Sequence, residues 1–252
     1  MKLLTLARDL KRRKARERQG LFVAEGIRSL EELVDSPLRI RGALAGPQLG
    51  SSDRGLELRE RLADRGVEVI DVTQEELESA SDTEAPQGLL AIAEIPRRTL
   101  DALELPDPAR LLVLDALQDP GNVGTILRTA AAFGAVAVVA LPGTVDLWNA
   151  KVVRSAMGIQ FRHPAIAATW DELADFLRAR EVALWAADMG GEPLSGDHAP
   201  ARLAVAVGNE GSGLSASVRD AADRVVSLPI ASDVESLNVA VAAGVILHEL
   251  RA

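Results

Sequence analysis

Five short apolar runs in the second half of the chain constrain its fold more than any other feature of the sequence. They cover residues 111–117, 136–141, 182–187, 203–207 and 225–230. Helix-like patterns alternate with them at 122–133, 149–157, 170–180, 215–221 and 238–250. Apolar runs of this kind are typical of strands buried on both faces of a parallel sheet, and the alternation is typical of the α/β class. We therefore expect a parallel-sheet α/β domain over residues 110–252.

The first half of the chain predicts a smaller α/β unit over residues 1–95. A first helix ends at Gly20, and strands are expected at 21–25, 38–45, 67–72 and 89–95, with helices at 26–35, 52–65 and 74–79. The segment 96–109 contains three prolines among charged residues. Because proline interrupts both helices and sheets, this segment is interpreted as an interdomain linker.

The residue types present limit the chemistry. The 252-residue chain has no cysteine, which excludes disulfides, a thiolate nucleophile and cysteine-ligated metals. His163, His198 and His248 are the three histidines, and their spacing fits neither a metal site nor a Ser-His-Asp triad. We therefore expect no metal. No apolar run is long enough to cross a bilayer and the N-terminus lacks the features of a signal peptide, so we expect no membrane association and a cytoplasmic location.

Charge is distributed unevenly along the chain. The formal net charge is −9, but residues 1–20 carry eight Lys or Arg and two acidic residues. A basic segment on an acidic body is typical of phosphate binding, and we take Lys11, Arg12 and Arg13 as candidate RNA contacts. The alternative is an amphipathic helix that buries Leu3 and Leu10 and leaves its cations in water. The segment alone does not choose between them.

The first of three unusual loops follows the run at 111–117 and reads Asp119-Pro-Gly-Asn-Val-Gly124. Ligands of open parallel sheets bind beyond the carboxyl ends of strands, so loops in this position are candidate sites. Asn122 can cap the following helix, and Arg128 lies within its first two turns. The alternative is an ordinary strand-to-helix turn with a surface arginine.

The second loop follows the run at 203–207 and reads Gly208-Asn-Glu-Gly-Ser-Gly213. Its glycines allow the backbone to approach a ligand closely, and Glu210 places a carboxylate among them. The loop matches no nucleotide-binding fingerprint. The alternative is a flexible turn.

The third loop runs from Leu228-Pro-Ile230 to Ser236-Leu-Asn238 and enters the last helix. Ser236 or Asn238 could act in a site or could serve only as the helix cap. The helix itself, 238–250, is almost entirely apolar and carries small residues including Gly244. A helix of this kind is normally buried, so we expect it at a subunit interface.

Together, the three loops resemble the three signature motifs of the SpoU (TrmH-like) ribose methyltransferases, which have a knotted α/β fold. Order, spacing and position after strands all agree, from residue 111 to the C-terminus. The three stretches are Asn122-x-Gly124-x-x-x-Arg128, Gly208-Asn-Glu-Gly-Ser-Gly213-Leu, and Leu228-Pro-Ile230 with Ser236-Leu-Asn-Val-Ala240. The stretch Phe22-Val-Ala-Glu-Gly26 also looks like the smaller, ribosomal-protein-like substrate-binding domain that precedes the catalytic domain in many members.

The resemblance implies transfer of a methyl group from S-adenosylmethionine to a ribose 2′-hydroxyl of RNA, a deep trefoil knot in the C-terminal domain, and a homodimer whose active site spans two subunits. The two-domain layout favours rRNA over tRNA. By motif position, Arg128 stabilises the reacting oxygen. The resemblance implies that the catalytic residues around it are Asn122, Glu210, Ser236 and Asn238. The cofactor-binding residues that it implies are Gly208, Leu228, Ile230 and Leu237. It also implies that Arg154 contacts RNA.

Other interpretations stay open from the sequence alone. Arg154 lies in a segment that an amphipathic helix would explain nearly as well. The chain could be a tRNA 2′-O-methyltransferase, a non-catalytic RNA-binding or assembly protein with the same fold, or an α/β enzyme that uses NAD. The absence of cysteine excludes methylases that attack a pyrimidine C5 through a thiolate. Aromatic residues make up only 3% of the chain, which favours recognition of RNA through phosphates and shape rather than base stacking.

Overall fold

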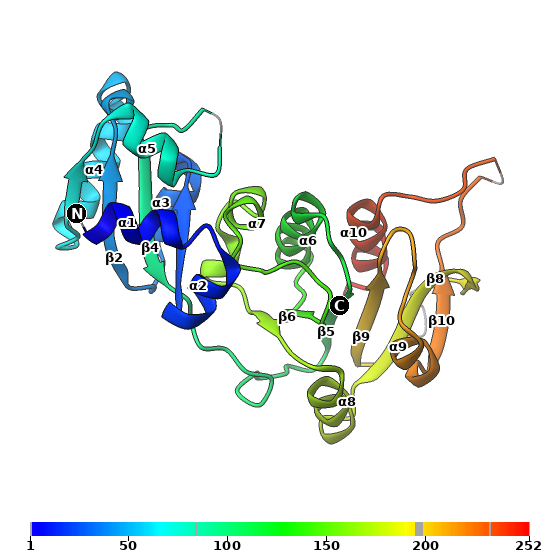
Figure 1. Ribbon diagram of the computed structural model, residues 1–252. Helices are drawn as coiled ribbons and strands as arrows, with labels where there is room; N and C mark the ends of the chain where they lie inside the picture. Colours follow the sequence, from blue (N-terminus) through cyan, green and yellow to red (C-terminus); the bar gives the residue numbers. More distant parts are fainter. Residues whose placement is uncertain (1, 84, 195–198, 232, 252) are drawn as a thin grey trace. The chain divides into compact units, whose positions relative to one another are not determined.

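The computed structural model describes residues 2–83, 85–194, 199–231 and 233–251 (Figure 1). The chain forms two compact units, Met1–Arg97 with Trp148–Arg162, and Arg98–Leu147 with His163–Ala252. His198 lies outside the described residues. Most of the predicted linker belongs to the second unit, where Leu100 and Leu103 are buried in the core. The division into domains at 96–109 stays a prediction.

The first unit is built on a four-stranded sheet in the order β1-β4-β2-β3. Strand β4 is antiparallel to both of its neighbours, and β2 is parallel to β3. The strands are β1 (Leu21–Glu25), β2 (Ile40–Ala45), β3 (Val69–Asp71) and β4 (Leu89–Glu94). The helices are α1 (Lys2–Asp9), α2 (Arg13–Gln19), α3 (Ile27–Asp35), α4 (Asp53–Asp64), α5 (Gln74–Ala80) and α7 (Ala150–Ser155), with 3₁₀ turns η1 (Pro47–Ser51) and η2 (Ile159–Phe161). The predicted α/β character of this half is confirmed.

The N-terminal segment forms two helices, so the prediction of one continuous helix was wrong. The guanidinium of Arg16 is buried and donates to the carbonyl oxygens of Leu10 and Lys11, at 2.8 and 2.9 Å. These bonds satisfy carbonyls at the end of α1 that a continuous helix would have used itself. Leu10 is buried, as the amphipathic pattern predicted, and Gly20 ends α2 at a φ of 63°.

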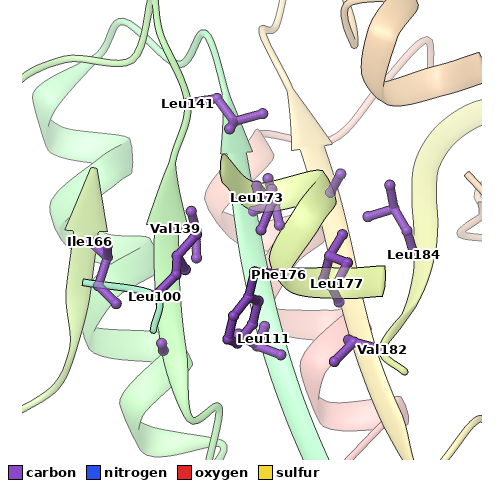
Figure 2. Packing of buried hydrophobic residues seen from close by; sticks show 14 of the residues in the cluster. Leu100, Leu111, Val139, Leu141, Ile166, Leu173, Phe176, Leu177, Val182 and Leu184 are labelled. Atoms are coloured by element: carbon purple, nitrogen blue, oxygen red, sulfur yellow. The ribbon is translucent and has the colours of Figure 1, made fainter. Parts of the chain in front are cut away.

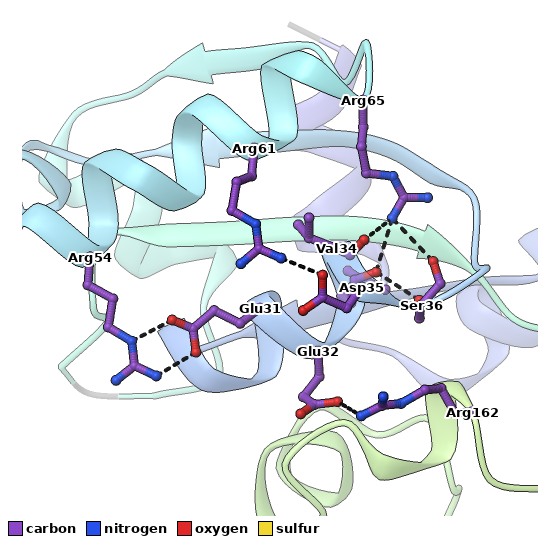
Figure 3. A network of polar contacts seen from close by, with 10 residues as sticks. Glu31, Glu32, Val34, Asp35, Ser36, Arg54, Arg61, Arg65 and Arg162 are labelled. Carbon is purple, nitrogen blue, oxygen red and sulfur yellow. Dashed lines mark hydrogen bonds and ion pairs between the residues drawn. The ribbon is translucent and has the colours of Figure 1, made fainter.

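Arginines of the first unit are used to join its helices (Figure 3). Arg54 and Arg61 on α4 form ion pairs with Glu31 and Asp35 on α3. Arg65, at the end of α4, donates to carbonyl oxygens of Leu33, Val34, Ser36 and Leu38 at the end of α3. A cation in this position complements the negative end of the helix dipole. Part of the charge of the chain is therefore neutralised internally.

The segment Trp148–Arg162 packs against the first unit although the sequence places it far from the rest of that unit. The ring of Phe22 on β1 lies 4.6 Å from that of Trp148 and 5.5 Å from that of Phe161, between centroids. Arg162 pairs with Glu32 of α3 (Figure 3). Aromatic pairs at these distances contribute beyond their buried area. The first unit is therefore assembled from two separate stretches of chain.

The second unit contains a six-stranded sheet in the order β10-β8-β9-β5-β6-β7, and every neighbouring pair is parallel. The strands are β5 (Ala109–Asp115), β6 (Ala137–Ala140), β7 (Ala165–Ala167), β8 (Ala183–Pro193), β9 (Arg202–Gly208) and β10 (Arg224–Ser227). The helices are α6 (Pro120–Ala132), α8 (Trp170–Ala179), α9 (Ala216–Ala221) and α10 (Val239–Glu249). The parallel α/β prediction is confirmed, whereas the trefoil knot stays a prediction.

Helix α8 covers one face of this sheet (Figure 2). Its side chains Leu173, Phe176 and Leu177 are buried in one cluster with Leu111 and Leu184 of the strands. Helices α6 and α10 pack against each other. A Cβ on Gly244 would lie 3.2 Å from the Thr129 methyl group, so the small residue allows the close approach that the sequence predicted, but to a helix of the same chain.

The largest differences between the predicted and the observed strands of the second unit concern β7, β8 and β10. Strand β7 was missed because Ala-Ile-Ala is too short and too rich in alanine to read as a strand. Strand β10 ends at Ser227, before Pro229, which has no N–H to donate to a ladder. Strand β8 runs to Pro193, with an irregularity in its pairing to β10.

His163 gives the second unit a pH-dependent stability. Burial, with a smaller contribution from the charge of Arg98, lowers the pKa of His163 to about 4. The unfolded imidazole titrates near pH 6.5, so the unfolded chain binds more protons between the two values, and the free energy of unfolding falls as the pH drops through this window. The expected loss is about 1–3 kcal/mol. In H163Q, urea unfolding at pH 7.5 and 4.5 will show a smaller difference than in the wild type.

Equal pH dependence in the wild type and H163Q would contradict the assignment to His163.

Candidate active site

The loops after β5 and β9 lie side by side because these two strands end at the same level. Asp115, the last residue of β5, is paired with Gly208, the last residue of β9. The carboxyl edge of a parallel sheet is where ligands of such folds bind. The register therefore brings the first two predicted loops together.

Asp119, and not Asn122, caps helix α6, so that part of the prediction was wrong. The Asp119 carboxylate accepts from the Asn122 backbone N–H at 2.7 Å. Pro120 stands at the first helical position, where its missing N–H costs nothing. Because Asp119 caps the helix, the Asn122 amide is left for other contacts.

Three predicted site residues form one hydrogen-bonded chain, which we call the amide–carboxylate chain. Asn238 Nδ2 donates to Asn122 Oδ1 at 3.0 Å, and Asn122 Nδ2 donates to Glu210 Oε1 at 2.5 Å. Asn238 Oδ1 also accepts from the backbone N–H of Ala240 at 2.9 Å, so Asn238 caps α10 and belongs to the site at once. The amide–carboxylate chain connects the three loops. It also orients the Asn122 amide so that its nitrogen faces Glu210 and its oxygen faces Asn238.

The glycine-rich loop is held by Asn209, which the sequence analysis did not single out. Its side-chain oxygen accepts from the backbone N–H groups of Gly211 and Ser212, at 2.9 and 3.1 Å, and its amide donates to the carbonyl of Ala116 at 3.1 Å. An asparagine that binds the backbone two residues on is a known turn former, and this could have been recognised from the sequence. Hydrogen bonds of the Asn209 side chain therefore join both parts of the loop to the end of β5.

Asp115 and Gly208 fix the base of the same loop. The buried Asp115 carboxylate accepts from the Ser215 backbone N–H at 2.6 Å. A Cβ on Gly208 would lie 2.4 Å from the carbonyl carbon of Gly213, so a side chain does not fit there. The signal for Asp115 in the sequence was a single carboxylate inside an otherwise apolar run.

A cavity of about 440 Å³ lies at this edge of the sheet. Its walls are mainly apolar, and the carboxylates of Glu210 and Asp188 line it among the described residues. Its size and lining fit a small-molecule ligand. The structure brings together there the predicted residues Gly208, Glu210, Leu228, Ile230, Ser236, Leu237 and Asn238.

Arg128 is not brought together with these residues. It is exposed on α6, it does not line the cavity, and its side chain has no hydrogen bond or ion pair with any residue in the described part of the chain. Arg128, which the sequence predicts to be the central catalytic cation, thus lies on the same helix as Asn122. In the single chain it lies outside the cavity.

Arg154 lies on α7 in the first unit and is paired with a carboxylate. It forms an ion pair with Glu25, whose side chain is only 4% exposed. Glu25 also accepts from the Ser81 hydroxyl at 2.6 Å and from the Asp82 backbone N–H at 3.1 Å. A buried carboxylate needs such partners. The pair joins α7 to β1, and the helix predicted at 149–157 is present, whereas an RNA contact of Arg154 stays a prediction.

The three basic candidates near the N-terminus also have partners within the chain. Lys11 donates to the Ser81 carbonyl oxygen at 2.7 Å, Arg12 pairs with Asp9, and Arg13 pairs with Glu17 at 2.7 Å. The Arg12 and Arg13 side chains remain largely exposed. Exposed pairs of this kind are weak and do not prevent the cations from binding phosphate.

Two further observations concern classes of site. Over 2–83, 85–194, 199–231 and 233–251, no three His, Asp or Glu side chains are grouped so that they could hold a metal ion. In the same residues, no helix has the length and apolar character needed to span a bilayer.

The sequence and fold match known proteins along nearly the whole chain. Residues 109–248 match the SpoU rRNA Methylase family, and residues 5–91 match the MRM3-like substrate binding domain. The chain is 31% identical over 246 residues to the 23S rRNA (guanosine(2553)-2'-O)-methyltransferase RlmP of Bacillus subtilis, covering 97% of this chain and 94% of that protein. It is 36% identical over 213 residues to the 23S rRNA (guanosine-2'-O-)-methyltransferase RlmB of Neisseria meningitidis serogroup B, covering 81% and 84%.

Solved structures give the same result. The SpoU methyltransferase AviRb from Streptomyces viridochromogenes, in complex with the cofactor AdoMet, has a TM-score of 0.87 at 29% identity, covering 98% of this chain and 96% of that one. An AdoMet-bound rRNA methyltransferase from Sinorhizobium meliloti has a TM-score of 0.85 at 27% identity, covering 99% and 94%.

Fold and site together define an α/β protein with a ligand cavity and a polar hydrogen-bonded chain at the carboxyl edge of a parallel sheet. The family match extends over more than half of the chain and includes all three loops. The chain belongs to the SpoU rRNA methylase family, and the resemblance found in the sequence is confirmed.

The close packing at Gly208 predicts a large effect of a single methyl group. G208A will force the loop away from Gly213 and lower the free energy of unfolding by about 1–3 kcal/mol, as overpacking does elsewhere. Urea unfolding measures this. G211A is the matched control in the same loop, because its Cβ would meet its nearest neighbour at an ordinary 3.5 Å. Equal stability of the two variants would contradict the packing argument.

Proposed function

We propose that this protein transfers a methyl group from S-adenosylmethionine to a ribose 2′-hydroxyl of large-subunit rRNA. The observation that carries the proposal is the amide–carboxylate chain of Asn238, Asn122 and Glu210 beside the cavity. Family membership and the printed names of the relatives, which are 23S rRNA 2′-O-methyltransferases, support the same reaction.

The residues present fit the cofactor. The cavity holds a molecule of nucleoside size, its apolar walls suit an adenine ring, and the four predicted cofactor-binding residues line it. When bound, S-adenosylmethionine supplies a methyl carbon on a positively charged sulfur. Gly208, Leu228, Ile230 and Leu237 would hold it, largely through backbone groups.

The protein's task is to orient the acceptor oxygen and to stabilise the charge that develops on it. In-line displacement depends strongly on alignment, and two polar side chains with fixed orientations, Asn122 and Asn238, serve that purpose. A guanidinium stays protonated in proteins, so Arg128 acts as a cation that stabilises the oxygen while the hydroxyl proton passes to a phosphate oxygen of the RNA and on to solvent, and not as a neutral base. Ser236 lines the same cavity and completes the polar surroundings.

The active particle in this proposal is a homodimer. Val241 and Val245 on α10 are 54% and 41% exposed, although five other apolar residues of that helix are buried. These valines border a groove between α6 and α10 that also contains Phe133. An apolar groove of this kind is typical of protein interfaces. A second copy would cover it, and would supply Arg128 to a site that the single chain leaves incomplete.

RNA contacts are proposed for the first unit. The match of residues 5–91 to a substrate binding domain supports this assignment. Lys11, Arg12 and Arg13 would contact phosphates, while Arg154 would reach RNA only by leaving Glu25. The trefoil knot and a cytoplasmic location remain part of this proposal. rRNA is favoured over tRNA by the named relatives that match across both units.

A non-catalytic assembly protein and an NAD-dependent enzyme are the rival functions. Residues 208–213 lack a dinucleotide fingerprint, and a protein that had lost catalysis would not need the amide–carboxylate chain intact. A radiolabelled methyl-transfer assay on ribosomal RNA and on transfer RNA tests the choice. Transfer to the former supports the proposal, and transfer to neither would refute it.

Replacement of Arg128 separates chemistry from binding. R128A will lower the rate of methyl transfer by at least about a hundredfold, the usual effect of removing one electrostatic contact to a transition state. Calorimetric binding of S-adenosylmethionine will be nearly unchanged. R178A removes an exposed arginine from α8 and will retain wild-type activity. Parallel loss of cofactor binding and activity in R128A would refute the role.

The dimer is tested at α10. V241E adds a charge at a position that is half exposed in the single chain, so the fold will tolerate it, but burial of an unpaired carboxylate between two subunits is costly. Sedimentation will show a dimeric wild type and a monomeric, inactive V241E. L56E, a similarly exposed position in the first unit, will remain dimeric. A monomeric wild type at micromolar concentration would overturn the dimer.

A further inference from the structure

Strand β8 carries a five-residue bulge at the rim of the cavity. Val225 of β10 is paired with Ala186, and the next residue, Val226, is paired with Glu192. Residues 187–191 of β8 therefore have no ladder partner in β10. Asp188 and Met189, in this bulge, line the cavity. Bulges often re-aim side chains next to active sites.

The bulge is held in place by specific contacts. The Gly190 backbone N–H donates to Asp188 Oδ1 at 3.0 Å, and the Ser227 hydroxyl donates to the Gly191 carbonyl oxygen at 2.9 Å. A Cβ on Gly191 would lie 2.6 Å from the Val226 carbonyl carbon, so glycine alone fits there. The position of Asp188 is thus determined by its own strand and by β10.

Arg219 of α9 forms an ion pair with Asp188. The Asp188 side chain keeps 22% of its surface exposed. A carboxylate has about four lone-pair sites, and the contacts with Gly190 and Arg219 use two of them. Within the part of the chain that the structure describes, Asp188 therefore keeps free acceptor positions, and its charge is already balanced by a neighbouring cation.

The two carboxylates that line the described part of the cavity have different partners. Glu210 is bound by Asn122 and belongs to the amide–carboxylate chain. Asp188 lies on β8, which is the neighbour of β9, the strand that leads into Glu210. A carboxylate paired with arginine favours a neutral hydrogen-bond donor over a second cation, because a further positive charge would compete with the guanidinium.

The donors of S-adenosylmethionine include a pair of adjacent hydroxyls on its ribose, which is joined to the reacting sulfur through one methylene group. Two adjacent hydroxyls match the two oxygens of one carboxylate, and they are neutral. The ammonium group of the methionine part is a cation and fits Asp188 poorly. The adenine amine is a neutral donor too, but it sits on a ring suited to the apolar walls.

We propose that Asp188, fixed by Arg219 and by the bulge at 187–191, accepts hydrogen bonds from the ribose hydroxyls of the cofactor and so determines selectivity for a ribonucleoside. This inference rests on the proposed function, because it concerns the cofactor of that same cavity. Arg219 acts through Asp188 and is a positioning residue.

Calorimetric binding of two ligands tests the inference. The ligands are S-adenosylhomocysteine and its 2′,3′-dideoxy analogue, measured with the full-length wild type, D188A and D188N. Loss of a hydrogen bond to a charged group costs about tenfold or more in affinity. D188A will bind S-adenosylhomocysteine at least about tenfold more weakly than the wild type, whereas the affinity for the dideoxy analogue will change less than about twofold.

D188N keeps an oxygen that can accept the hydrogen bond from the Gly190 N–H. It replaces D188A in the test if the thermal midpoint of D188A shows that this variant does not fold. It will also weaken the natural ligand more than the analogue. Glu192 is an exposed residue of the same strand, and its carboxylate is paired with Arg224. E192Q is therefore the matched control and will bind both ligands as the wild type does.

Equal weakening of both ligands in the Asp188 variants would mean that Asp188 only shapes the cavity, and would overturn the inference. Unchanged binding of both would overturn it as well. A wild type that binds neither ligand would instead refute the proposed function, so the two failures are distinguishable.

Discussion

The parallel pairing of β5 with β9, in the register that sets Asp115 opposite Gly208, is the constraint on which the site depends. A shift of one residue in this pairing would turn one strand over relative to the other and displace the two loops that follow them. In the observed register, Asp115 anchors the second loop at Ser215 and Asn209 anchors it to Ala116. These contacts hold the loop in the position in which Glu210 accepts a hydrogen bond from Asn122.

Charge on this protein is managed locally. The net charge of −9 is unexpected for a protein that binds RNA, but many carboxylates are already used within the fold. Glu31 and Asp35 hold arginines of α4, and Glu25 holds Arg154. An RNA phosphate competes with such carboxylates for the arginine side chains, and the net charge of the chain matters less. Because this binding is electrostatic, the affinity for RNA will depend strongly on salt.

The sequence predicts well what depends on local patterns. The apolar runs gave the central parallel strands, and the strand-end loops gave Asn122, Glu210 and Asn238, which the structure links by hydrogen bonds. What it missed depends on tertiary contacts. The helix cap was assigned to Asn122 because Asp119-Pro-Gly-Asn122 offers two capping residues, and the bulge in β8 exists only through its pairing with β10. The partner of Arg154 lies 129 residues away, beyond the reach of any pattern.

The interleaving of the two units limits how the protein can be divided or recombined. Trp148–Arg162 is encoded between β6 and β7 of the second unit, yet Trp148 and Phe161 stack on Phe22 of the first. A chain cut at Arg98 would keep these aromatic rings but lose the surface that shelters them, and would expose them to solvent. Exchange of the N-terminal unit between relatives must therefore transfer both stretches together, which couples the evolution of a short insert to that of a remote β-strand.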